Sequence, residues 1–70
     1  MDYVVIIEKT ESSYGAYVPD LPGCVAAGET RESALQLIQE AIRIHIEDLR
    51  RDGNAMPEPA CSIELVHVDL

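Results

Sequence analysis

The stretch VPDLPGCVAAGET, residues 18–30, holds two prolines, a Pro-Gly pair, a cysteine and a threonine suited to begin a helix. Pro22 and Gly23 fit the two central positions of a type II turn, where proline presets φ and glycine accepts a positive φ. Pro19 ends the preceding strand, because proline has no N–H to donate to a β-ladder. The stretch therefore predicts the end of one strand, a tight turn, a short second strand and the start of a helix.

The residues before this turn are rich in β-branched and aromatic side chains. YVVIIEK, residues 3–9, carries β-branched residues on both alternating faces, which is typical of a strand covered on two sides. YGAYV, residues 14–18, follows a short polar connection and predicts an antiparallel partner for the first strand. Together with CVAAG, residues 24–28, these segments predict a meander of three strands.

A long amphipathic helix is expected after the meander, over residues 31–52. Thr30 is a suitable N-cap, and Gly53 supplies the usual C-terminal stop. The apolar stripe of this helix is wider than packing on one sheet requires, because Leu37 and Ile44 fall beyond its edge. We predict that these two side chains contact another subunit of a homodimer or tetramer. The alternative is that the final segment of the chain covers them.

The last ten residues, CSIELVHVDL, alternate between two faces and predict a fourth strand, added at an edge of the sheet. The element order is then β-β-β-α-β. This order predicts a single small α+β domain over residues 1–70, an antiparallel sheet with one long helix packed on it.

The charge of the chain restricts its partners. Thirteen acidic residues face five basic ones, which gives a formal net charge of −8. Nucleic acid is an unsuitable partner for such a surface, because phosphate binding relies on clustered Lys and Arg. An acidic domain suits a basic protein, although the charge also serves solubility. No apolar run approaches the ~20 residues that cross a bilayer, and we expect a cytoplasmic protein with reduced thiols.

No residue pattern typical of catalysis, phosphate binding or cofactor binding is present. A nucleophilic cysteine needs a nearby base or positive charge, and the sequence supplies none beside either cysteine. The glycines lack the spacing of a phosphate-binding loop. The histidines and cysteines also lack the spacing typical of metal ligands. The residues considered for these roles are Cys24, His45, Cys61 and His67. We therefore expect no catalytic, cofactor or metal residues, and we interpret His45 as a core or interface histidine.

Two segments of the sequence resemble the HicB family of antitoxins. They are VPDLPGCVAAGETRESA, residues 18–34, and residues 45–59, which end in PEP; the resemblance extends over nearly the whole chain. It implies a partial ribonuclease H-like fold and a partner, HicA, a small basic toxin that degrades messenger RNA. HicB-like domains are thought to inhibit by covering the toxin's RNA-binding and catalytic surface. Many members add a C-terminal DNA-binding domain, but no basic recognition element follows here, so we expect no direct binding of nucleic acid.

The leading hypothesis is thus a non-enzymatic antitoxin that covers a basic toxin. We expect Tyr14 and Tyr17 to act as aromatic anchors beside the 19–23 turn. We expect the carboxylate of Asp20 to meet a toxin cation and Leu21 to enter a shallow pocket. Pro22 is expected to be exposed in the same turn. For the two tyrosines, cross-strand packing is the alternative role.

Two other functions stay open at this point. One is an oligomeric structural or ligand-binding module that has no toxin. The other is a metal-dependent nuclease, which would use Asp2, Glu8 and Glu32.

Overall fold

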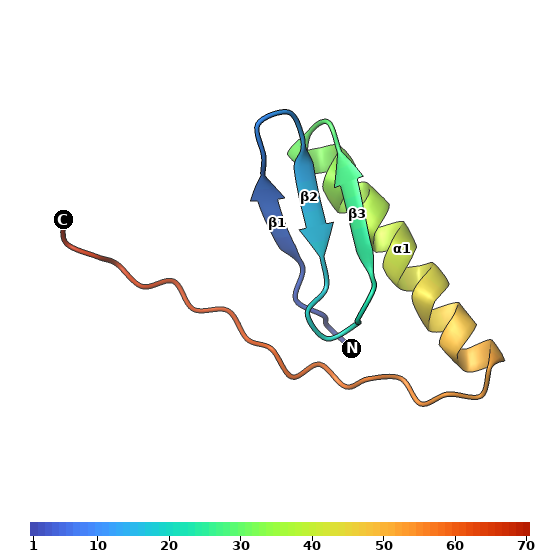
Figure 1. The fold of residues 1–70 in the computed structure, drawn as a ribbon. Coiled ribbons are helices and arrows are strands. Elements are labelled where there is room, and N and C mark those ends of the chain that lie inside the picture. Colours follow the sequence, from blue (N-terminus) through green and yellow to red (C-terminus); the bar gives the residue numbers. More distant parts are fainter.

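The computed structural model describes residues 1–70 and contains three strands followed by one helix (Figure 1). The strands are β1 (Ile6–Lys9), β2 (Tyr14–Tyr17) and β3 (Val25–Gly28), and the helix is α1 (Arg31–Arg51). The sheet has the order β1-β2-β3, and both neighbouring pairs are antiparallel. The predicted α+β class is confirmed, although β1 is shorter than the 3–9 segment expected for it.

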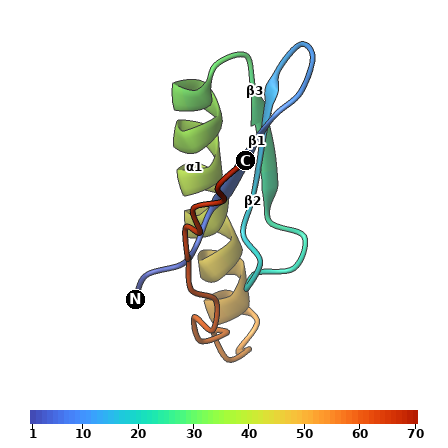
Figure 2. The ribbon, with the colours of Figure 1, turned by 90° about the vertical axis from the view of Figure 1, so that its left-hand side faces the viewer.

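The helix α1 packs on one face of the sheet and leaves the other face uncovered (Figure 2). Between these two layers lies a core of six buried residues. It consists of Ala16, Val18, Leu21, Cys24, Ala34 and Ile38. Pairing places Ile7 opposite Ala16 and Ala16 opposite Ala26, so one row of small and branched side chains meets the helix. This small core is typical of a chain of 70 residues, which buries little apolar surface on folding.

Both ends of α1 follow from the residues predicted to set them. The side chain of Thr30 accepts a hydrogen bond from the backbone N–H of Ser33, and the Ser33 hydroxyl accepts one from the N–H of Thr30. This reciprocal pair satisfies two donors that a helix N-terminus otherwise leaves unpaired. Gly53 has a φ of 74° just after the helix, which ends it. The helix is not apolar enough along its length to cross a lipid bilayer.

The connection between β2 and β3 is the predicted type II turn. The N–H of Cys24 donates to the carbonyl of Leu21 across Pro22 and Gly23, at 3.0 Å, and Gly23 has a φ of 82°. Two more hydrogen bonds hold the loop closed, from Val18 N–H to the carbonyl of Cys24 and from Leu21 N–H to the carbonyl of Val18. The turn is therefore a rigid part of the fold.

Replacing Gly23 by valine is expected to lower the free energy of unfolding by about 1–3 kcal/mol, the usual cost of an unfavourable backbone conformation. A Cβ at this position would meet no atom within 4 Å, so the cost comes from the positive φ alone. Gly23→Asn is the matched control, because asparagine tolerates this conformation better than valine. Urea unfolding of the three proteins measures the effect. If the valine variant were as stable as the unmodified chain, the assignment of a type II turn with a positive φ at Gly23 would be wrong.

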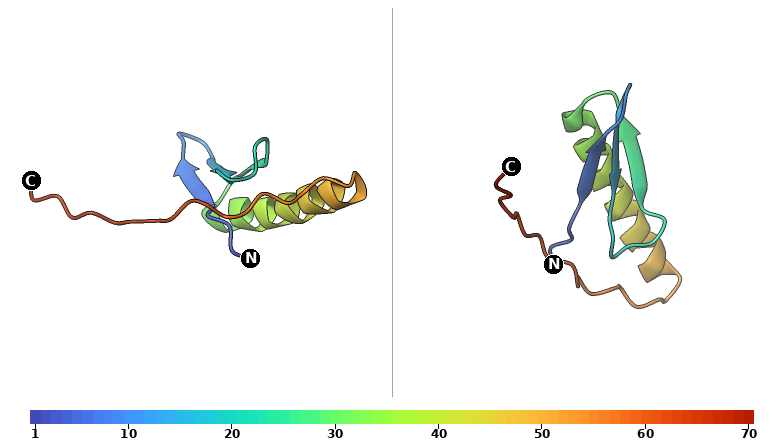
Figure 3. Two further views of the ribbon diagram at one scale, coloured as in Figure 1. Left: turned by 90° about the horizontal axis from the view of Figure 1, so that it is seen from below. Right: turned by 60° about the vertical axis from the view of Figure 1, so that its left-hand side comes forward.

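The predicted fourth strand is not formed within the chain. Residues 54–70 belong to no helix or strand, and they run under the lower end of the sheet and out past β1 (Figures 1 and 3). Alternation of apolar side chains is typical of a strand, but a strand also needs a partner edge. The segment is extended and does not pair with β1 or β3 of its own chain.

Candidate partner-binding surface

The sheet face opposite α1, called the open face here, carries a cross-strand row of three apolar side chains. Ile6 pairs with Tyr17, and Tyr17 pairs with Val25, so their side chains lie next to one another across all three strands. Tyr17 and Val25 are exposed, at 39% and 66%. In the next row, Glu8 stands opposite Gly15. The open face thus combines an aromatic and aliphatic row with an adjacent carboxylate.

The net charge of the chain is carried entirely outside the helix. Within α1, four acidic residues are balanced by four arginines. The strands, loops and both terminal segments hold the other nine acidic residues and a single basic one, Lys9. The formal charge of −8 therefore belongs to the sheet, its loops and the terminal segments. A cationic protein would be attracted to this part of the molecule rather than to the helix.

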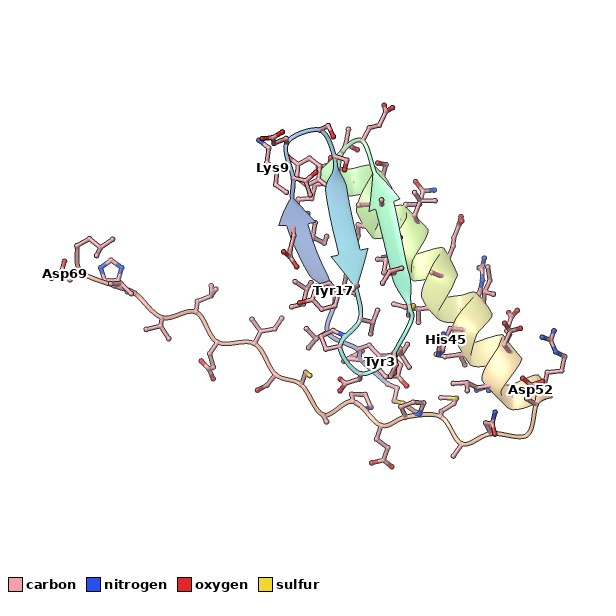
Figure 4. All side chains as sticks on the ribbon, viewed as in Figure 1. Tyr3, Lys9, Tyr17, His45, Asp52 and Asp69 are labelled. Carbon is pink, nitrogen blue, oxygen red and sulfur yellow. The ribbon has the colours of Figure 1, made fainter.

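The two tyrosines expected as a pair of anchors lie on opposite faces of the sheet. Tyr14 begins β2, at the end of the strand away from the 19–23 turn, and it packs against the core on the side of α1. Tyr17 ends β2 beside the turn and points to the open face (Figure 4). Because strand side chains alternate, residues three apart cannot share a face. Tyr17 remains a candidate anchor, whereas Tyr14 has the packing role that was its alternative.

Leu21 cannot enter a partner's pocket, and this expectation is corrected. Its side chain is completely buried in the core, at 0% exposure, under the Pro22-Gly23 turn. Pro22 itself is exposed at the tip of the turn. The turn thus uses its leucine to fix the loop to the core and presents the proline to solvent.

Asp20 already has partners within the chain. Its Oδ2 accepts hydrogen bonds from the backbone N–H groups of Ala60 and Cys61, at 3.1 and 3.2 Å. The Cys61 thiol also donates to Oδ1, at 3.5 Å. These contacts fasten the segment after α1 to the β2–β3 turn. The hydrogen bond from Ala60, together with those from Cys61, outweighs desolvation and lowers the pKa of Asp20 below its ordinary value of 3.8.

Acidification is expected to release this segment from the turn. Because the pKa of Asp20 is lowered in the folded chain, its stabilising contribution is complete above pH 3.8 and is lost as the pH falls through the folded-state pKa. The amide resonances of Ala60 and Cys61, followed by NMR, should shift together with a midpoint below pH 3.8. In the Asp20→Ala variant, the amides of Ala60 and Cys61 should have the chemical shifts of the released segment already at neutral pH. A midpoint at or above pH 3.8 would show that Asp20 does not accept these hydrogen bonds.

Neither cysteine is set up as a nucleophile. Cys24 is buried, and desolvation raises the pKa of its thiol. Cys61 is exposed, and the hydrogen bond to Asp20 raises the pKa of its thiol. A raised pKa reduces the thiolate fraction on which thiol reactivity depends.

His45 lines a shallow groove of about 250 Å³ between the turn and the second half of α1 (Figure 4). The groove is mostly apolar, and its lining residues are Gly23, Cys24, Val25, Ala41, Ile44, His45 and Asp48. His45 is half-buried there, as expected for a histidine on the apolar side of the helix. No three His, Cys, Asp or Glu side chains of the chain are grouped so that they could hold a metal ion. The acids considered for a nuclease, Asp2, Glu8 and Glu32, therefore form no such group.

Leu37 and Ile44 lie outside the core, as the sequence pattern predicts, and Ile44 borders the groove beside the turn. They are exposed at 43% and 55%. Because both side chains are exposed in the single chain, the final segment does not bury them. Their role as a subunit contact stays a prediction.

Sequence reasoning missed Ile6 and Val25 as members of a surface. Each was assigned only to a strand, because the sequence does not give the register that brings both beside Tyr17. The signal that was available is the apolar character of both faces of residues 3–9. It indicated that the open face of β1 would also be covered.

Comparison with known proteins identifies the class to which this fold and surface belong. The family model of the HicB-like antitoxin of bacterial toxin–antitoxin systems matches residues 3–69. The chain therefore belongs to the HicB-like antitoxin family, and the resemblance found in the sequence is confirmed.

Individual relatives agree with this assignment. A UPF0150 protein of Thermoplasma acidophilum is 43% identical over 68 residues, which cover 96% of this chain and 99% of the relative. The chain also matches an uncharacterised protein of Haemophilus phage HP1 with 41% identity, but it spans only 44% of the length of that protein.

Two solved structures share the fold. The N-terminal domain of the Burkholderia pseudomallei antitoxin HicB has a TM-score of 0.71 and 34% identity, over 94% of this chain and 95% of that one. A chain of the HicA3 and HicB3 toxin–antitoxin complex has the same TM-score and 35% identity, over 86% of this chain and 70% of that one.

Proposed function

We propose that residues 1–70 act as one antitoxin domain that binds and neutralises a small basic HicA-type toxin by covering its active surface. The observation that carries this proposal is the separation of charge, because the whole net charge of −8 lies outside a neutral helix. Membership of the HicB-like antitoxin family and the likeness to a chain of a HicA3–HicB3 complex support it. The role is one of binding and requires no catalysis by the chain.

The open face is the part of this surface that meets the toxin most directly. Its row of Ile6, Tyr17 and Val25 provides apolar contact area, and Glu8 beside it provides an anion. Tyrosine at the centre of such a row is a typical interface anchor, since it offers a large contact area with few rotatable bonds. The carboxylates around it take the place of RNA phosphates against the toxin's cationic groove. Pro22 is exposed at the tip of the turn that follows Tyr17 in the chain.

The test first looks in the reading frames beside the gene of this chain for a small basic HicA-type toxin, and then measures its binding by calorimetry. Two charge reversals form a matched pair: Glu8→Lys on the open face and Glu40→Lys on the exposed side of α1. Both change the net charge equally, so only their position differs. We expect Glu8→Lys to weaken binding by about tenfold or more and Glu40→Lys to have little effect. Equal effects would contradict a defined binding face, and no binding by the unmodified chain would overturn the proposal.

Association with the toxin is expected to slow as salt is added. Attraction between an acidic surface and a basic protein is screened within about 10 Å at 0.1 M ionic strength. Raising the salt from low to several times physiological concentration should therefore lower the association rate by about tenfold or more. Stopped-flow measurements give this rate directly. A rate that does not respond to salt would show that the −8 charge does not guide the encounter.

A further inference from the structure

The segment after the Asp20 contact, residues 62–70 and here called the C-terminal segment, exposes apolar side chains that a single copy of the chain leaves in water. Five of its residues are large and apolar, and each is more than 60% exposed; Leu65 reaches 94%. They are Ile63, Leu65, Val66, Val68 and Leu70. Such a concentration of exposed apolar surface indicates a binding site for another macromolecule.

The beginning of this segment is held in place, so its direction is defined. The Tyr3 hydroxyl donates to the carbonyl of Pro57, and Asp20 accepts from Ala60 and Cys61. These contacts place the start of the segment at the lower end of the sheet. From there it continues outward past β1 instead of turning along it (Figures 1 and 3). Nine extended residues reach about 30 Å beyond the last contact.

Both outer strands of the sheet, β1 and β3, have an unpaired edge, and the C-terminal segment runs out on the side of β1 (Figure 1). In the order β1-β2-β3, β1 pairs only with β2, so its other side has free N–H and C=O groups. Residues 3–5 extend this edge at its start, outside the ladder. The apolar side chains along it, from Tyr3 to Ile7, are only half-buried. An unpaired edge of this kind is a template for a strand from another chain.

We infer that the C-terminal segments of two copies are exchanged, each pairing as a fourth strand with β1 of the other copy. A second copy fits because one chain carries both halves of the contact, an extended apolar strand and a free strand edge. Exchange about a two-fold axis uses both halves twice and leaves neither unpaired, so the assembly is closed. It would also cover part of the apolar surface of β1, which α1 alone leaves half-exposed.

Repulsion between two acidic copies works against this pairing, so the association of two copies has its own dependence on salt. Glu64 and Asp69 of the segment approach a β1 that carries Glu8 and Lys9, and both copies have a net charge of −8. Added salt therefore strengthens the association of two copies, whereas it weakens binding of a basic toxin.

The experiment measures mass in solution by light scattering, for the full chain and two proline variants. Val66→Pro removes an N–H that the exchanged strand needs, at a residue that is 81% exposed in a single copy. Ala55→Pro, in the connection before the segment, is the control. We expect the unmodified chain and Ala55→Pro to have twice the single-chain mass of 7.7 kDa, and Val66→Pro to have 7.7 kDa with unchanged helix content.

Hydrogen exchange of the C-terminal segment separates the remaining possibilities. Protection of its amides that disappears on dilution supports exchange. Protection in a monomer at every concentration would overturn it, because the segment would then pair with its own β1. An unprotected segment, or a dimer that survives Val66→Pro and is lost in Ile44→Asp, would also overturn it, in favour of no association or of the helix face. These results do not depend on toxin binding, so each proposal can fail alone.

Discussion

Gly28→Ala is expected to destabilise the domain by about 1–3 kcal/mol, although alanine is the smallest possible side chain to add. A Cβ at Gly28 would lie 2.6 Å from the backbone nitrogen of Ala34 and closer still to the Ser33 hydroxyl. Neither atom is free to move. Ser33 forms the reciprocal cap with Thr30, and Ala34 N–H donates to the Thr30 carbonyl. The first turn of α1 would therefore have to shift away from β3.

The matched control is Gly15→Ala in the neighbouring strand. Gly15 has an ordinary φ, and a Cβ there would meet no atom within 4 Å, so this change should be neutral or slightly stabilising. Thermal unfolding resolves the difference, since 1 kcal/mol shifts the midpoint of a domain this size by about 4–8 °C. Equal midpoints for the two alanine variants would show that β3 and α1 do not approach each other so closely.

Tyr17→Ala is expected to weaken toxin binding by about 30-fold, equivalent to about 2 kcal/mol. Tyr17 is the central side chain of the open-face row and the only exposed aromatic residue of the sheet. Its loss removes contact area from the middle of the proposed interface. The strand pairs themselves remain, so the domain should stay folded, with a loss of stability of up to about 1 kcal/mol.

Leu37→Ala provides the comparison, because Leu37 is about as exposed as Tyr17 but lies on the neutral helix. Calorimetry should show nearly unchanged toxin affinity for this variant. Circular dichroism of both variants confirms folding before binding is measured. If Leu37→Ala costs as much affinity as Tyr17→Ala, the toxin binds the helix side, and the proposed orientation is wrong.

Local chemistry made much of the fold predictable from the sequence. Pro22 and Gly23 specify a type II turn whatever surrounds them, and Thr30 and Gly53 set the ends of α1 by hydrogen bonding and backbone conformation. The three-strand meander follows from the short connections between apolar segments. In each case the information lies within a few neighbouring residues.

The features that the sequence did not reveal depend on contacts between distant residues. Asp20 was expected to face a partner, yet it accepts hydrogen bonds from Ala60 and Cys61, forty residues away. Leu21 was expected at the surface, but the turn folds its side chain into the core. The fourth strand was predicted from alternation alone, which reports the character of a segment and not whether its own chain offers an edge.

The separation of Tyr14 from Tyr17 follows from the sequence alone. With residues 14–18 predicted as a strand, the period of two already places them on opposite faces. The nearly neutral charge of the helix was also readable from the sequence, because the predicted bounds of residues 31–52 differ from α1 only by Asp52. Because the helix carries almost none of the net charge, the acidic surface must lie on the sheet, its loops and the terminal segments. The net charge of the whole chain does not give this location.

The most direct test of the antitoxin role is a messenger RNA cleavage assay with a small basic HicA-type toxin, sought first in the reading frames beside the gene of this chain, at physiological salt. Increasing amounts of the folded chain should reduce cleavage in proportion and abolish it once every toxin molecule is bound. Cleavage at full rate in the presence of excess folded chain would contradict the account.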